Sequence, residues 1–474
     1  MMTCSSLLLA GLMAVQGYQL DISRSKVPTM ASLHRIVDIL AALGYNQFQL
    51  YTEHTFAYSR HRTVWENASP MTSSEVRELD AYCAARGIEL VPNQNSFGHL
   101  EQWFRHPEYN GLAEAPLGGT TCGTGYTLKF PMCLNPTDPR SVEFLANLYD
   151  ELFPCFRSKL VNVGCDETME LLDDHEPRLG RSAAVIREKG PHQVYVDFLN
   201  RINALCAARG HRIMYWGDII LQHPEFLPQL PRDSICLNWG YEANHPFEQQ
   251  TAALEKSGRA FYVCPSTTSH SSLVGRYTNM AGTIDNCLRA GARHGAAGVL
   301  MTDWGNTGHP HPWVVSLPSL VYLSLSRRGS RPSREAVAAE VDRLAGAHVG
   351  EALITLGDLY LVTSGRAVLE AVVRRGKDFP WRPKEVSDEQ IVRAVALWHE
   401  AMKKRDLTGA PDWVKEDFAL LDLYGEMLDM RLAEPNAKNF RGRFEPRYRA
   451  LWLKQNRPGG LERSMALVFA EEYP

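Results

Sequence analysis

Two adjacent carboxylates, Asp166 and Glu167, follow the mainly apolar run Leu160–Cys165 and are well suited to acid–base chemistry. Successive side chains of a strand point to opposite faces, so both acids can enter one site only where the strand stops and the backbone turns. The carboxyl ends of parallel strands are also where α/β barrels place catalytic groups. The alternative is an exposed acidic turn, or a helix start capped by Asp166 or Thr168. We favour catalysis because of what accompanies the pair.

Residues 17–330 repeat one pattern, in which a short β-rich run and a polar turn precede a stretch with helical periodicity. The eight β-rich runs are Tyr18–Ile22, Asn46–Thr52, Ile88–Asn93, Lys159–Cys165, Arg212–Trp216, Ser234–Trp239, Ala260–Cys264 and Gly298–Thr302. Helices are predicted between them over Ser32–Leu43, Ser73–Arg86, Gln193–Arg209, Phe247–Ser257 and Thr283–His294. Eight βα units in sequence favour a closed (β/α)8 TIM barrel over an open doubly wound sheet. No GxGxxG or GxxxxGK[ST] motif opens a helix, so nucleotide binding has no support.

Two further segments flank the predicted barrel. Residues 331–474 lack strand-like runs and show helical periodicity, as in Glu335–Leu344, Glu389–Met402 and Trp413–Leu432, which predicts a helical C-terminal region. Residues 1–16 form an N-terminal segment whose apolar stretch Leu7–Val15 has the length of a signal peptide but no preceding basic residue. We favour a packed segment over an export signal, and the cytoplasm over export, although the compartment stays open.

Composition excludes several classes of function. Of the 474 residues, 45% are hydrophobic and 22% charged, which is typical of a globular protein with a large core. The formal net charge is −4 and the basic residues are scattered, so no nucleic-acid partner is predicted. The early apolar stretch is too short to span a bilayer, so no membrane partner is predicted. The ten cysteines show no CxxC or Cys/His metal spacing, and we expect neither a metal nor another cofactor.

Polar side chains and indoles alternate along the predicted strand ends. Trp216, Trp239 and Trp304 follow the fifth, sixth and eighth strands. An aromatic wall beside carboxylates suits a sugar ring, which has apolar C–H faces to stack and hydroxyls to bind. Polar residues after the other strands are Asp21, Arg24, Glu53, His54, Asn93, Asn95 and His99, and Asp218 follows the fifth.

These motifs carry a resemblance to a known family. The segment Gly17–Arg24, the strand end Val163–Glu167 and the three tryptophans together resemble the catalytic domain of family 20 glycoside hydrolases, the β-N-acetylhexosaminidases. The segments Leu50–Phe56 and Pro92–His99 resemble a bacterial-type branch of that family. The resemblance implies an exo-acting enzyme that removes terminal β-linked GlcNAc or GalNAc from N-acetylhexosamine-containing glycans. It leaves the oligomeric state and the choice between the two sugars open.

The resemblance also implies substrate-assisted retention, because family 20 is an exception to the rule of two opposed carboxylates. The substrate's 2-acetamido oxygen would attack the anomeric carbon and form an oxazolinium intermediate. Asp166 would orient the acetamido N–H. Glu167 would protonate the leaving oxygen and then activate water, which requires that burial and the neighbouring acid raise the pKa of Glu167. Substrate-binding roles would fall to Gln16, Glu53, His99, Trp216, Trp239, Trp304 and Asn306.

Three positions depart from the family pattern. Gln16 stands where an arginine usually grips sugar hydroxyls, Asn306 where an acid is usual, and His270 where an aromatic residue is expected. If Gln16 lies in the pocket, Gln16→Arg should raise kcat/KM. The departures support a second hypothesis, a catalytically impaired sugar-binding barrel of the same fold. Turnover of an aryl β-N-acetylglucosaminide distinguishes the two.

Overall fold

The chain folds into a (β/α)8 barrel with a helical C-terminal region, as predicted. The computed structural model describes residues 13–115, 129–172, 180–306, 308–329, 331–435 and 437–469. Within them, eight strands form one sheet in the order β3-β2-β1-β8-β7-β6-β5-β4, and all the paired strands are parallel. A parallel bridge between Asn93 and Asn162, just after β3 and at the end of β4, brings the two edges together and nearly closes the barrel.

The predicted β-rich runs match the strands to within a few residues. The strands are β1 (Val15–Asp21), β2 (Gln47–Tyr51), β3 (Glu89–Val91), β4 (Leu160–Asn162), β5 (Arg212–Trp216), β6 (Ile235–Trp239), β7 (Ala260–Cys264) and β8 (Gly298–Asp303). The main difference lies in β4, which ends at Asn162 although the apolar run continues to Cys165. The backbone turns over these last residues, and this turn shapes the site described below.

The predicted helices are also present, with shifts of a few residues at most of their ends. The longer helices around the barrel are α2 (Met30–Ala42), α4 (Ser73–Ala84), α6 (Pro139–Leu152), α9 (Pro191–Ala207), α11 (Phe247–Ser257), α12 (Tyr277–His294) and α13 (Leu317–Arg327). Shorter ones are α3 (Arg62–Trp65), α5 (Glu101–Phe104), α7 (Met169–Leu172), α8 (Ala183–Lys189) and α10 (Asp218–Gln222). Thr72 begins α4 with a capping box, in which its hydroxyl accepts from the Glu75 N–H and Glu75 accepts from the Thr72 N–H.

Alternation along the strands separates two apolar clusters. On β5, Met214 and Trp216 join the smaller cluster inside the barrel, whereas Ile213 and Tyr215 join the large cluster between strands and helices. Successive side chains of a strand point to opposite faces, so the apolar strands of a barrel can supply both layers. The inner cluster continues to Trp304 at the end of β8, and therefore reaches the rim that carries the candidate site.

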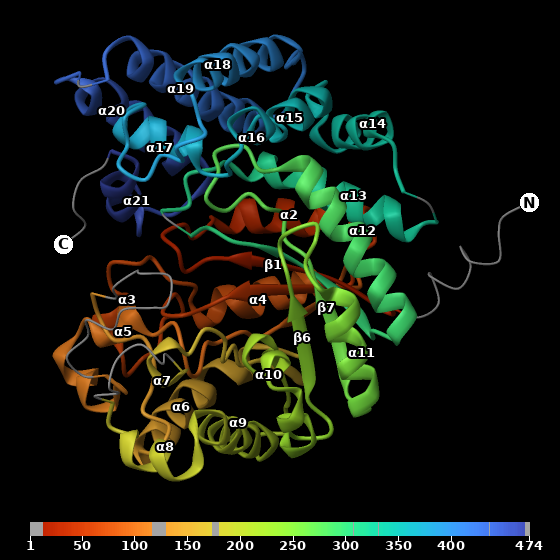
Figure 1. Ribbon diagram of the computed structural model, residues 1–474, viewed down its shortest axis with the longest axis vertical. Coiled ribbons are helices and arrows are strands. Elements are labelled where there is room, and N and C mark those ends of the chain that lie inside the picture. The colour runs from red at the N-terminus through yellow and green to blue at the C-terminus, as the bar shows by residue number, and fades with distance from the viewer. Residues whose placement is uncertain are drawn as a thin grey trace, which may run out of the picture.

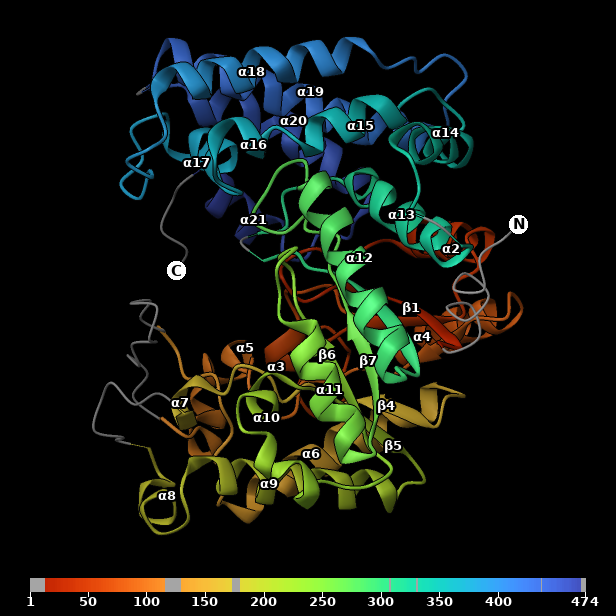
Figure 2. The same cartoon turned by 45° about the vertical axis from the view of Figure 1, so that its right-hand side comes forward.

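The C-terminal helices form a layer at one end of the molecule, next to α12 and α13 in both views (Figures 1 and 2). They are α14 (Arg334–Ala345), α15 (Gly350–Gly357), α16 (Tyr360–Thr363), α17 (Val368–Arg375), α18 (Asp388–Lys403), α19 (Asp412–Ala433), α20 (Phe440–Gln455) and α21 (Leu461–Val468). Buried side chains of these helices belong to the same large cluster as the barrel's outer layer. This region therefore packs on the barrel.

Three sequence-based expectations concern the chain as a whole. Most of the apolar stretch Leu7–Val15 lies outside the described residues, which begin at Met13. Among the described residues, no single helix is long and apolar enough to cross a membrane, although Gly350–Thr363 and Val368–Arg375 pass that test as a pair bent by 84°. The same residues contain no group of three or more His, Cys, Asp or Glu side chains that could hold a metal ion.

Candidate active site

The backbone after β4 turns sharply and carries the acid pair. Gly164, Cys165 and Glu167 have positive φ values of 69°, 71° and 46°, a region that non-glycine residues enter at a cost. At Gly164 a Cβ atom would lie 1.8 Å from Oδ1 of Asn95, so only glycine fits there. The strand alternation is thereby broken just before the acid pair, and Asp166 and Glu167 can face the same neighbour.

That neighbour is His99, in the loop after β3. Its Nε2 lies 3.3 Å from Oδ2 of Asp166 and 3.3 Å from Oε2 of Glu167. The loop approaches closely because Gly98 has no side chain, and a Cβ atom there would lie 2.5 Å from the Asp166 carbonyl oxygen. His99 itself has a φ of 57°. One imidazole nitrogen thus contacts both carboxylates.

The charges in this cluster differ from the sequence-based expectation. Burial lowers the pKa of His99, but the Asp166 and Glu167 carboxylates outweigh burial and raise it well above its usual value. The contact with His99 in turn lowers the pKa of Glu167, against the opposing effect of burial. We expected a raised pKa for Glu167. The reason for the difference is His99, a neighbour from the loop after β3 whose positive charge favours the ionised form of Glu167.

Asp166 is 7% exposed, and its Oδ1 atom has no hydrogen-bond partner among the described residues. A buried carboxylate oxygen without a donor is costly, so this atom is available to a ligand's N–H or O–H. Asp218, at the start of α10, accepts the backbone N–H of Glu167 through Oδ2 at 3.0 Å. Burial and the nearby Asp166 charge raise the pKa of Asp218 to about 7.

Arg24 connects the loops that follow β1, β2 and β3. Its Nε lies 3.2 Å from Oε1 of Glu53, its Nη1 lies 3.3 Å from Oδ2 of Asp21, and its Nη2 lies 3.5 Å from Nδ1 of His99. The Tyr51 hydroxyl also donates to Oε1 of Glu53, at 3.0 Å. Burial raises the pKa of Glu53, and the Arg24 charge acts in the opposite direction. The structure therefore places Glu53 and His99 in one network with the acid pair.

An aromatic wall stands beside the acids. Trp216 and Trp304 have their rings 6.0 Å apart, and Trp239 stacks on Tyr241 at 4.9 Å. The Trp304 indole donates to the Tyr241 hydroxyl at 2.7 Å, which joins the two pairs. The Trp239 indole donates to Oδ1 of Asp218 at 3.4 Å. The three tryptophans chosen from the sequence thus lie in one cluster that adjoins the carboxylates.

Gln16 lies elsewhere. It is the second residue of β1 and pairs with Val299, so about 16 Å of strand, at about 3.3 Å per residue, separates it from Asp21 at the other end. Its side chain donates to the Leu43 carbonyl at 3.5 Å and accepts from Arg327 at 3.2 Å. The structure does not bring Gln16 to the acid pair, because the strand holds it near the amino end of the barrel. The guanidinium in the cluster belongs to Arg24.

The other two departures lie at the carboxyl rim. Asn306 is exposed, with a φ of 42°, and follows Trp304 by two positions. His270 is 3% exposed and packs edge-on against Tyr241, with 5.4 Å between the ring centres. It therefore occupies the position where an aromatic residue was expected. Burial lowers the pKa of His270 to about 3, and the neutral ring suits this packing.

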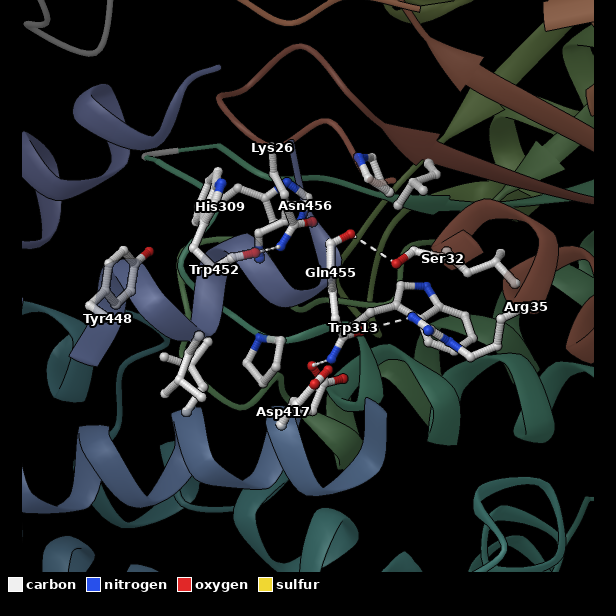
Figure 3. Close-up of a pocket in the computed structure, with 17 residues that line it drawn as sticks. Lys26, Ser32, Arg35, His309, Trp313, Asp417, Tyr448, Trp452, Gln455 and Asn456 are labelled. Carbon is white, nitrogen blue, oxygen red and sulfur yellow. Dashed lines mark hydrogen bonds between the residues drawn. The ribbon is translucent and has the colours of Figure 1, made fainter. Parts of the chain in front are cut away.

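The C-terminal region contacts the segments that follow Arg24 and Trp304, because the Arg457 N–H donates to the Val27 carbonyl at 2.8 Å and the Ser464 hydroxyl donates to the Gly308 carbonyl. Figure 3 shows a cavity at this contact, with Gln455 of α20 at its centre. The Gln455 amide donates to Oδ1 of Asp417 at 2.9 Å, and its backbone carbonyl accepts from Ser32 at 2.8 Å. Asp417 also accepts the N–H of Val314, beyond β8, at 2.9 Å. This cavity lies away from the acid pair. Its residues lie next to the site and have a structural role.

Five neighbours of the acid pair were not among the site residues predicted from the sequence. They are Arg24, Tyr51, Asn95, Asp218 and Tyr241. Three of them, Arg24, Asn95 and Asp218, are polar residues after strands and were visible as such, since parallel strand ends converge on one rim. Tyr51 and Tyr241 gave no comparable signal. Their roles depend on hydroxyl contacts, with Glu53 and Trp304, that only the folded chain creates.

A nearly closed parallel barrel with carboxylates, an imidazole and an indole wall at its carboxyl rim is the architecture of a barrel glycoside hydrolase. Comparison with known families gives the particular one. The family model described as "Glycosyl hydrolase family 20, catalytic domain" matches residues 14–270. The chain therefore belongs to glycoside hydrolase family 20.

Individual relatives agree with this assignment. A β-hexosaminidase of Akkermansia muciniphila is 27% identical over 233 residues, which are 44% of this chain and 46% of that protein. Human hexosaminidase D is 22% identical over 345 residues, covering 67% of this chain and 66% of that protein. The match thus spans less than half of the bacterial relative.

Solved structures support the fold. A β-N-acetylhexosaminidase crystal structure superposes with a TM-score of 0.56 at 20% identity, covering 70% of this chain and 76% of that one. The chitobiase of Flavobacterium johnsoniae gives a TM-score of 0.56 at 16% identity, over 96% of this chain and 78% of that one.

Proposed function

We propose that this protein is an exo-acting β-N-acetylhexosaminidase that removes terminal β-linked GlcNAc or GalNAc by substrate-assisted, retaining hydrolysis. The observation that carries the proposal is the adjacent acid pair turned towards one imidazole. Carboxylates arranged in this way cannot flank a scissile bond as acid and opposed nucleophile. An internal nucleophile from the substrate is then needed, and a 2-acetamido group provides one.

In the first step, the acetamido oxygen attacks the anomeric carbon while the bond to the leaving oxygen breaks. Oδ1 of Asp166, which is buried and has no hydrogen-bond partner among the described residues, accepts the acetamido N–H and stabilises the positive charge of the oxazolinium. Glu167 transfers a proton to the leaving oxygen. The two carboxylates raise the pKa of His99, whose Nε2 lies 3.3 Å from the Glu167 carboxylate. We therefore infer that His99 holds a proton and supplies it to Glu167 as the bond breaks.

In the second step, Glu167 takes a proton from water, the water oxygen bonds to the anomeric carbon, and the oxazolinium ring opens to restore the acetamide. Two inversions at the same carbon give net retention. Trp216, Trp239 and Trp304 enclose the pyranose and the acetamido methyl, and so hold the acetamido oxygen in a reactive position. Arg24 is the residue in the cluster with forked donors for the sugar hydroxyls.

The substrate requirement tests the proposal. An aryl β-N-acetylglucosaminide should be hydrolysed and the matching aryl β-glucoside should be essentially inert, because the latter lacks the internal nucleophile. A thiazoline mimic of the oxazolinium should inhibit competitively. Comparable rates on the two glycosides would rule out substrate assistance. No turnover of either would favour the impaired sugar-binding barrel.

Variants of the two acids test the assigned roles. Glu167→Gln should lower hydrolysis of natural glycosides by roughly 10²–10⁴-fold and affect activated aryl glycosides less, since good leaving groups need little protonation. Asp166→Asn should impair both substrate classes alike. An unchanged dependence on the leaving group in Glu167→Gln would contradict the assignment.

A further inference from the structure

Asp218 contacts two parts of the candidate site at once and has no part in the mechanism above. It is the first residue of α10, two positions after the end of β5. Its Oδ2 accepts the backbone N–H of Glu167 at 3.0 Å, and its Oδ1 accepts the indole N–H of Trp239 at 3.4 Å. Each carboxylate oxygen therefore holds one N–H group, one from the turn after β4 and one from the end of β6.

The backbone before Asp218 explains why its side chain reaches both segments. The Gly217 N–H donates to the Leu237 carbonyl of β6 at 2.9 Å. A Cβ atom at Gly217 would lie 2.6 Å from Sγ of Cys236, so a larger residue would push this segment away from β6. Because glycine allows the close approach, Asp218 lies beside Trp239, which follows Leu237 by two positions.

Of the three tryptophans in the aromatic wall, Trp239 depends most on such a contact. Trp216 and Trp304 are 1% and 7% exposed, so packing in the barrel's inner cluster holds their rings. Trp239 is half-buried and stacks on Tyr241. Stacking fixes the plane of a ring but leaves it free to rotate and slide within that plane. The hydrogen bond from the indole N–H to Asp218 removes this freedom.

The other contact of Asp218 holds the turn that carries the acid pair. Glu167 has a φ of 46°, a conformation that a non-glycine residue keeps only when its surroundings fix it. Asp218 accepts the N–H of the peptide unit that joins Asp166 to Glu167. Burial and the Asp166 charge raise the pKa of Asp218, whereas the Glu167 and Trp239 N–H groups act in the opposite direction because they bind the carboxylate.

We propose that Asp218 is a positioning residue that sets the specificity for the N-acyl group of the substrate. The inference rests on the proposed function, in which Asp166 accepts the acetamido N–H and Trp239 helps to enclose the acetamido methyl. Asp218 links the Trp239 indole to the peptide unit between Asp166 and Glu167. It therefore fixes the distance between the apolar wall and the amide-binding carboxylate, and this distance determines how large an acyl group fits.

The test compares aryl glycosides of N-acetylglucosamine and N-propanoylglucosamine, which share the nucleophilic oxygen and differ by one methylene. We expect the wild-type protein to prefer the N-acetyl substrate by roughly 10- to 200-fold in kcat/KM, as a tight apolar pocket does. Asp218→Asn keeps an oxygen for the Glu167 N–H and presents an NH2 group, which cannot accept, to the Trp239 indole. The preference should fall by about tenfold or more, because the wall can then yield to the longer acyl group.

A double-mutant cycle shows whether Asp218 acts through Trp239. Trp239→Phe keeps an aromatic ring and removes the N–H, so it should lower the preference by itself, and adding Asp218→Asn should lower it no further. Asp218→Ser, whose side chain is too short for both contacts, is the second variant if Asp218→Asn does not fold. Asp233→Asn, at an exposed position before β6, is the matched control and should keep the wild-type preference.

Three kinetic outcomes would overturn the proposal. The first is equal kcat/KM for the two substrates with the wild-type protein. The second is a wild-type preference in the Asp218 variant. The third is a double variant in which the effects of the two single changes multiply, because Asp218 would then act independently of Trp239.

The hydrogen bond can also be measured without activity. In protein with isotope-labelled tryptophan, the indole N–H of Trp239 gives the NMR signal that is missing from Trp239→Phe. Asp218→Asn should shift this signal, because the proton loses its carboxylate acceptor, and Asp233→Asn should leave it in place. An unshifted signal in Asp218→Asn would overturn the proposal.

Failure of the proposed function would look different. If the wild-type protein does not hydrolyse the aryl N-acetylglucosaminide, the hydrolase assignment fails, and calorimetry with free N-acetylglucosamine and N-propanoylglucosamine tests Asp218 separately. A preference for the N-acetyl sugar that falls about tenfold or more in Asp218→Asn would support the positioning role. An equal preference in the two proteins, or no binding of either sugar, would overturn it.

Discussion

The guanidinium carbon of Arg24 lies 5.1 Å from the centre of the Trp304 indole, so the loop after β1 packs directly on the end of β8. The same guanidinium lies 4.5 Å from the Tyr51 ring at the end of β2. A cation held against two aromatic faces and ion-paired with Glu53 is positioned by the barrel itself. Arg24 therefore presents its remaining donors in a fixed direction.

We predict that Arg24→Lys lowers kcat/KM on an aryl N-acetylglucosaminide by roughly 10- to 150-fold, which corresponds to the loss of about 1.5–3 kcal/mol in charge-assisted hydrogen bonds. Lysine keeps the charge but loses the planar fork and the stacking. Steady-state kinetics measure the effect. Arg62→Lys, at a side chain that is 78% exposed, serves as the control. Equal kinetics for the two variants would remove Arg24 from the site.

The second prediction concerns pH and His99. Activity requires a proton on the His99–Glu167 pair, so it should be lost as the pH rises through the upper pKa of that pair. In the wild-type protein this pKa is high, because the Asp166 and Glu167 carboxylates outweigh the effect of burial on His99. In His99→Asn only the Glu167 carboxyl can hold the proton. The alkaline limb of the kcat/KM profile should therefore move to lower pH by about one unit or more.

A profile that keeps its alkaline limb in His99→Asn would show that His99 does not hold the catalytic proton. His348→Asn provides the control, since the His348 side chain is 80% exposed and lies on the C-terminal region. Its profile should match that of the wild-type protein.

Much of this architecture was predictable from the sequence because it depends on local rules. The eight β-rich runs alternate with helical stretches, and parallel strand ends converge on one rim. These two rules were sufficient to predict that Asp166, His99 and Trp304 lie on the same rim. A turn at the acid pair was also predictable, because two adjacent acids can share a face only where the strand alternation is broken, but the end of β4 at Asn162, three residues before the end of the apolar run, was not.

What could not be predicted depends on contacts between distant segments. The resemblance placed Gln16 in the pocket because of its position in the motif. However, the position of a residue along a strand determines which end of the barrel it lies at, and Gln16 lies near the amino end of β1. The pKa of Glu167 is lowered by its contact with His99, and this contact could not be predicted from either residue alone. The cavity in Figure 3 needs Gln455 from the C-terminal region, which no motif connects to the barrel.

The third prediction concerns stability. Burial raises the pKa of Asp218 in the folded protein to about 7, against about 3.9 for an unperturbed aspartate. The folded state therefore binds more protons between these values, and Asp218 makes the protein less stable as the pH rises from about 4 to about 7. Asp218→Asn keeps an acceptor for the Glu167 N–H and removes this dependence. Urea unfolding should show the variant gaining stability over the wild-type protein through that window.

The exposed Asp233, before β6, supplies the comparison. Asp233→Asn should follow the wild-type free energy of unfolding at every pH. If the difference between Asp218→Asn and the wild-type protein stays constant from pH 4 to 7, the folded-state pKa of Asp218 is not raised.

The last prediction tests whether the C-terminal helices support the site. Gln455 is 8% exposed and its side chain also donates to the Trp413 carbonyl at 3.0 Å and accepts from Arg35 at 2.8 Å. Gln455→Ala leaves these buried partners unsatisfied, which should lower the free energy of unfolding by about 1–3 kcal/mol. The loops that carry Arg24 and Trp304 should loosen as well, so KM should rise more than kcat falls. Gln249→Ala, at an exposed position on α11, should change neither quantity. If Gln455→Ala lowers the free energy of unfolding but keeps the wild-type KM, the C-terminal region contributes to packing and does not support the site.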